Sequence, residues 1–149
     1  MAEATLAQRM AQLSLVQGQV AKEITGQVIF PSLDSIGQLD RMIDQRLPKR
    51  LHGEPEEVAE VIGAFLGEAL RRGLAADWQS GPKGPLLVLK DGRTLDPMKR
   101  ALSRVTHGRA WSLFAYSRLA QAYAQDPEQT KSPEDIPARR LLGRARRRS

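Results

Sequence analysis

Six arginines within the last eleven residues are the densest group of chemically distinctive side chains in this sequence. A guanidinium group can donate two parallel hydrogen bonds to a phosphate or a carboxylate. Such a segment can bind nucleic acid, lie on an anionic membrane surface, dock in an acidic groove of a protein, or serve only as a flexible solubilising tail. The predicted polyanion-binding or acidic-partner-binding residues are Arg139, Arg140, Arg144, Arg146, Arg147 and Arg148.

The net charge of +6 belongs entirely to this tail. Without its six arginines, 17 basic and 17 acidic residues remain over residues 1–138. A body with no net charge has no general attraction for polyanions. Any binding of nucleic acid should therefore depend on the tail.

His52 and His107 are the residues best suited to acid–base chemistry. Both fall at expected turns, and the sequence places neither a serine nor an acid beside them. At the C-terminal end of a helix, His107 more often complements the helix dipole than acts as a base. The chain has no cysteine and no calcium-binding loop motif. We therefore expect no enzyme activity, no catalytic residues, no metal and no cofactor.

The sequence contains no run of about eighteen apolar residues, the length that a transmembrane helix needs. Its N-terminus lacks a basic segment followed by an apolar core, so a secretory signal is not expected. The absence of cysteine fits a reducing compartment. These features predict a cytoplasmic protein.

The first element that can position a binding surface is a helix over residues 4–25. Its apolar residues and one glutamine alternate in spacings of four and three, which is the pattern of a coiled-coil seam. Either this helix packs on its own domain, or it pairs with another copy or a partner. The predicted interface residues are Leu6, Met10, Leu13, Gln17, Val20 and Ile24.

Two further helices are expected over residues 32–47 and 54–73. In the first, Asp34, Asp40, Asp44 and Arg41 are interpreted as a solvated face. One place on the opposite, apolar face is filled by either Leu39 or Asp40. The second has a wide apolar stripe. Its Gly63 and Gly67 lie four residues apart, a spacing that allows another backbone to approach closely.

The remaining sequence predicts a small sheet and two more helices. Trp78 should anchor a strand to the core, because one tryptophan can bury a large area. A hairpin over residues 86–96 turns at Asp91-Gly92. Asp96 and Pro97 have the residue types that begin a helix. A last helix should run from about residue 109 to 125.

The sequence therefore predicts a mainly helical α+β fold, with about five helices on a two- to three-stranded antiparallel sheet. Residues 1–125 form one domain with a long N-terminal helix. Residues 126–138 contain three prolines and several charges, and are expected to form an extended linker. Residues 139–149 form the flexible arginine tail.

The segment Val61-Ile62-Gly63-Ala64-Phe65-Leu66-Gly67-Glu68, followed by Trp78 and a hairpin ending in Gly92…Leu95-Asp96-Pro97, resembles a pattern in small uncharacterised bacterial domains. In those domains a "GAYLGE"-like helix precedes a tryptophan strand and a "dG…ldP" hairpin. Phe65 stands here where that pattern has tyrosine. The resemblance covers residues 54–98 and implies a bacterial α+β domain, but no activity.

With no catalytic set, the sequence predicts a non-enzymatic interaction, scaffold or adaptor protein. Its N-terminal helix would bind another copy or a partner, and its tail an acidic partner. The alternative is a nucleic-acid-associated protein whose body positions the tail.

Overall fold

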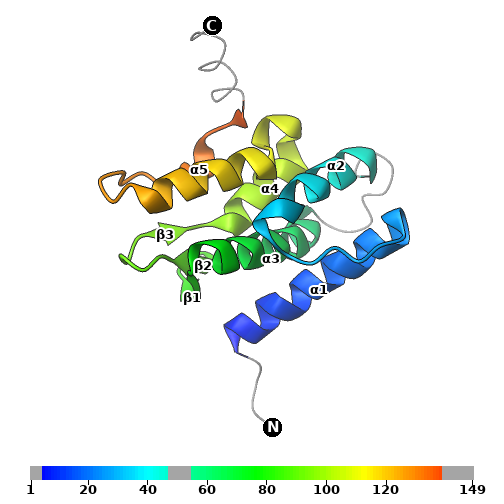
Figure 1. The fold of residues 1–149 in the computed structure, drawn as a ribbon, viewed down its shortest axis with the longest axis horizontal. Coiled ribbons are helices and arrows are strands. Elements are labelled where there is room, and N and C mark those ends of the chain that lie inside the picture. Colours follow the sequence, from blue (N-terminus) through cyan, green and yellow to red (C-terminus); the bar gives the residue numbers. More distant parts are fainter. Residues whose placement is uncertain (1–4, 47–54, 139–149) are drawn as a thin grey trace, which may run out of the picture.

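The structure is a computed structural model, and it describes residues 5–46 and 55–138. In these ranges five α-helices pack with a three-stranded antiparallel sheet, which confirms the predicted mainly helical α+β fold (Figure 1). In chain order the elements are α1 (Leu6–Thr25), η1 (Leu33–Ser35), α2 (Ile36–Arg46), α3 (Pro55–Leu74), β1 (Asp77–Gly81), β2 (Gly84–Val88), β3 (Thr94–Leu95), α4 (Pro97–His107), η2 (Arg109–Trp111), α5 (Leu113–Gln125) and η3 (Pro133–Asp135), where η denotes a short 3₁₀ helix.

Helix α3 is the element around which the others pack. Glu56 and Glu57 lie in its first turn and Arg71 and Arg72 in its last, so its charges complement the helix dipole. The residues from Ile62 to Leu70 are all buried. Helices α1 and α4 both pack against α3, and in Figure 1 α1 runs along one edge of the molecule with α5 on the opposite side.

Gly63 of α3 allows the close approach of another backbone that the glycine spacing predicts, whereas Gly67 makes room for a side chain. A Cβ atom built on Gly63 would lie 3.2 Å from the Cα atom of Met98 in α4. One built on Gly67 would lie 2.1 Å from the indole of Trp78. The indole Nε1 of Trp78 donates a hydrogen bond to buried Glu68 at 2.9 Å. Trp78 is half-buried against the core and ties the sheet to α3.

The sheet has the order β1-β2-β3 and is antiparallel throughout. Gly81 pairs with Gly84, so β1 and β2 form a tight hairpin across residues 80–85, whose glycines and prolines are typical of a loop. The expected second hairpin turns at Asp91-Gly92, where Gly92 has a φ of 91°. Asp96 then accepts a hydrogen bond from the backbone of Lys99 and caps α4, with Pro97 in the first position.

Residues 126–138 are not the extended linker that their composition predicts. They pack against the body, with Pro133 and Glu134 buried in η3. Arg93 donates hydrogen bonds to the backbone carbonyls of Asp126 and Gln129, at 3.0 and 2.7 Å. The folded body therefore extends beyond residue 125 to the end of the described chain at Ala138. The predicted arginine tail, residues 139–149, lies outside the described residues.

Candidate functional site

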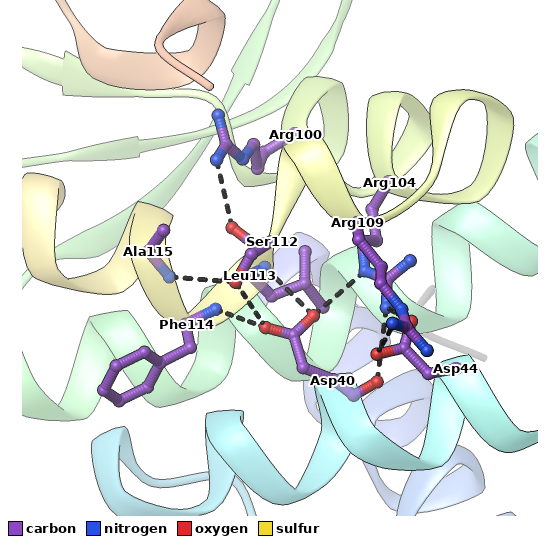
Figure 2. A network of polar contacts seen from close by, with 9 residues as sticks. All are labelled: Asp40, Asp44, Arg100, Arg104, Arg109, Ser112, Leu113, Phe114 and Ala115. Carbon is purple, nitrogen blue, oxygen red and sulfur yellow. Dashed lines mark hydrogen bonds and ion pairs between the residues drawn. The ribbon is translucent and has the colours of Figure 1, made fainter. Parts of the chain in front are cut away.

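The strongest concentration of charged groups in the described residues centres on Asp40 of α2 (Figure 2). Its Oδ1 accepts hydrogen bonds from Nε of Arg104 and the backbone N–H of Leu113, both at 3.0 Å. Its Oδ2 accepts from the hydroxyl of Ser112 at 2.8 Å and the backbone N–H of Phe114 at 2.7 Å. The carboxylate thus satisfies the free amide groups that begin α5.

Asp44, one turn further along α2, extends this network. It forms an ion pair with Nη2 of Arg104, and a second with Nε of Arg109 at 3.4 Å. The side chain of Arg104 is only 4% exposed, so its charge is shielded from water. These contacts correct the interpretation of Asp40 and Asp44 as part of a solvated face; Asp34 and Arg41 are exposed as expected.

Every oxygen of the Asp40 carboxylate is already used by two donors. A general base or a metal ligand needs an electron pair that can reach a substrate or an ion. The network instead joins α2, α4 and the start of α5, and its role is structural. One signal in the sequence pointed to it: an acid at a position on the apolar side of a helix needs a buried partner.

Arg100, one turn before Arg104 on α4, holds the C-terminal segment. It is fully buried and donates to the carbonyl oxygens of Ser112, Glu134 and Ile136, at 3.0, 3.3 and 2.6 Å. Its guanidinium group also lies over the rings of Trp111 and Tyr116. Burial lowers the pKa of Arg100 to about 10, which still leaves it charged at neutral pH.

Glu134 and Tyr116 form the second buried titratable pair. The Tyr116 hydroxyl donates to Oε2 of Glu134 at 2.9 Å, and the Ser132 hydroxyl donates to the same carboxylate. Burial raises the pKa of Glu134, and it raises that of the fully buried Tyr116 well above its ordinary value. Raised pKa values can mark catalytic groups. Here both side chains are buried where the C-terminal segment meets α5, and they hydrogen-bond to each other.

Two surface hollows of about 310 Å³ each offer space for a small ligand. One lies between residues 27–29 and α2, where Arg41 and three glutamines line it. The other lies over β1 and β2, near Asp77 and Lys90. Neither is lined by a histidine or by a pair of acids. Within residues 5–46 and 55–138, no group of three or more acidic or histidine side chains is arranged to hold a metal ion.

The predicted interface residues of α1 are divided between the inside and the outside of the molecule. Met10 and Gln17 are buried, and Leu6 and Leu13 are half-buried. Val20 is 38% exposed, and the side chain of Ile24 is not among those described. Helix α1 packs against α3 through its buried face. Of the two alternatives that the sequence leaves open, packing on its own domain therefore applies to this face, and pairing with a partner does not.

The outward face of α1 carries a different set of apolar side chains. Leu15, Val16 and Val20 are 54%, 49% and 38% exposed. They are three of the six large apolar side chains that are exposed in the described part of the chain. Leu15 and Val16 fall outside the heptad seam, so the spacing of apolar residues does not predict them as interface residues. Val16 and Val20 are four residues apart and share one side of the helix, whereas Leu15 lies about 100° around the helix from Val16. No acid or arginine lies between Val16 and Val20, so this apolar stripe is the candidate interaction surface.

Comparisons with known proteins add no relative: no family model, curated protein or solved structure matches this chain. The resemblance to small bacterial domains stays a prediction. None of the described helices is long and apolar enough to cross a membrane.

Proposed function

We propose that this chain is a non-enzymatic protein-interaction module that binds its partner through the outward face of α1. The observation that carries the proposal is the exposure of Val16 and Val20, which are four residues apart and share one side of α1. Full burial of such a side chain contributes roughly 1.5–3 kcal/mol, so covering the exposed half of each would contribute about 1 kcal/mol apiece. This gain favours a partner that covers the stripe.

The use of the internal polar groups supports a binding role over catalysis. Asp40 of α2 accepts hydrogen bonds from Arg104 of α4 and from the start of α5. Tyr116 of α5 donates to Glu134 of η3. These bonds hold the fold together. The exposed parts of the Val16 and Val20 side chains, in contrast, take no part in the packing of the fold. We also propose a cytoplasmic setting, in agreement with the absence of cysteine.

The test compares two variants that each place a charge on an exposed apolar side chain. Val16→Asp changes the stripe, and Leu102→Asp changes α4, where Leu102 is 37% exposed. Tagged proteins would be purified from the native host, and retained proteins, including untagged copies of this chain, identified by mass spectrometry. We expect a retained protein that Val16→Asp loses and Leu102→Asp keeps. If no retained protein depends on Val16, the proposal is wrong.

A second candidate function rests on the arginine tail, because its six arginines carry the whole net positive charge of the chain and residues 1–138 have no net charge. The tail would bind a polyanion such as nucleic acid, or an acidic protein. Binding of a labelled DNA duplex by the full chain should then weaken steeply with salt and disappear on deletion of residues 139–149. If the chain does not bind the duplex at low salt, nucleic acid is excluded as the partner of the tail, and an acidic protein remains as the candidate partner.

A further inference from the structure

Three residues of α1 lie along a single line on its outward face. Arg9, Val16 and Glu23 follow one another at intervals of seven residues, or nearly two full helical turns. All three are exposed. The buried residues Met10, Gln17 and Ala21 lie roughly 100–140° around the helix from this line. The line is therefore open to solvent along most of α1.

The two charges on this line are opposite, and they are equally far from Val16. Neither Arg9 nor Glu23 has an ion-pair partner among the described residues, although other charged side chains, such as Arg71 and Arg93, do. Gln12 and Gln19 are exposed between them and carry no charge. The face thus has a positive end, an apolar centre and a negative end.

We propose that this face pairs with the same face of a second copy, with the two α1 helices antiparallel and a two-fold axis at Val16. This inference rests on the proposed function and names its partner. Under that symmetry each position is matched by the position equally far on the other side of Val16. Arg9 lies opposite the partner's Glu23, Gln12 opposite the partner's Val20, and Val16 opposite the partner's Val16.

The charges decide the direction of the pairing. An antiparallel pair contains two ion pairs between Arg9 and the partner's Glu23. A parallel pair would place Arg9 against Arg9 and Glu23 against Glu23, which is unfavourable at both ends. A partner of unrelated sequence would need this charge order by chance, whereas a second copy supplies it by symmetry.

The test exchanges the two charges in the full chain and measures the mass by sedimentation. Arg9→Glu alone and Glu23→Arg alone each leave like charges facing each other, and each should weaken the dimer about tenfold or more. The double variant R9E/E23R restores both ion pairs and should sediment as the wild type does. An equimolar mixture of the two single variants should form mixed dimers, because one chain is acidic at both positions and the other basic.

The fold should tolerate these changes, since an acid near the start of a helix and a base near its end suit the helix dipole. Circular dichroism checks this for each variant, and Leu102→Asp serves as the control that should remain dimeric. A monomeric wild type, or single variants as dimeric as the wild type, would overturn the pairing. In that event the proposed function would still be supported if a different protein co-purified with the wild-type chain and was lost from the Val16→Asp variant.

Discussion

Asp40 and Arg104 form a buried ion pair that joins α2 to α4, with Arg104 Nε 3.0 Å from Asp40 Oδ1. The two residues are 64 positions apart in the chain. Burying such a pair has a desolvation cost of several kcal/mol, which is offset only when further hydrogen bonds satisfy both groups. Three additional donors on Asp40 and the contact between Arg104 and Asp44 meet that condition.

The first prediction is that Asp40→Asn destabilises the protein by about 3 kcal/mol. The amide keeps the size of the side chain but removes its charge, and its NH₂ group faces either the backbone donors of α5 or Arg104. Urea unfolding followed by circular dichroism measures the loss. Asp34→Asn is the control, because Asp34 is exposed and should change the free energy of unfolding by less than about 0.5 kcal/mol. Equal effects of the two substitutions would contradict the structural role of the network.

Local signals in the sequence predicted the helices well, because caps and hydrophobic periodicity depend on neighbouring residues. Asp96 and Pro97 begin α4, and Gly63 in α3 allows the predicted close approach of another backbone. The Asp40–Arg104 pair could not be predicted in this way. Both residues have charged side chains that are usually exposed, and their burial depends on how α2 and α4 meet in the fold.

The second prediction concerns the contact between α3 and the sheet. Gly67→Ala should destabilise the protein by roughly 1–3 kcal/mol, because the new methyl group would overlap the Trp78 indole. Gly37→Ala in α2 is the matched control: the nearest atom to its Cβ would be 3.6 Å away, an ordinary contact. There the better helix propensity of alanine should leave the stability unchanged or raise it by up to about 1 kcal/mol. Thermal unfolding of both variants measures the difference, and a stabilising Gly67→Ala would contradict the packing described.

The C-terminal segment shows a second limit of the sequence. Its prolines and charges are typical of a linker. Its contacts, however, come mainly from carbonyl oxygens that Arg93 and Arg100 bind. Every residue has such an oxygen, so side-chain composition gives no sign of these backbone contacts. The exposed stripe of α1 is harder to predict for a related reason: which apolar face turns outward is decided by packing on α3.

The third prediction is a pH dependence that comes from Glu134. Burial raises the pKa of Glu134 in the folded protein above its ordinary value of 4.5, so the folded state holds the proton more tightly than the unfolded chain does. The contribution of Glu134 to stability is therefore fully present below about pH 4.5 and is lost as the pH rises through the folded pKa. Glu134→Gln cannot titrate and keeps an oxygen that can accept from Tyr116.

The measurement is the free energy of unfolding of both proteins from about pH 4 to about pH 8. Other acids contribute equally to both, so the difference isolates Glu134. We expect the wild type to lose stability relative to Glu134→Gln as the pH rises. A difference that stays constant across this range would contradict the buried position of the carboxyl group.

The fourth prediction separates the C-terminal segment from the tail by two deletions. Removing residues 139–149 should leave the free energy of unfolding unchanged, because the remaining body has as many acidic as basic residues. Removing residues 126–149 should cost roughly 3 kcal/mol or more, since the buried Arg100 loses two of its three carbonyl partners and Tyr116 loses its acceptor. Urea unfolding of the two shortened chains gives the comparison. If both deletions were equally harmless, residues 126–138 would be the linker that their composition suggests. If the shorter deletion alone unfolded the protein, the body would not be independent of its tail.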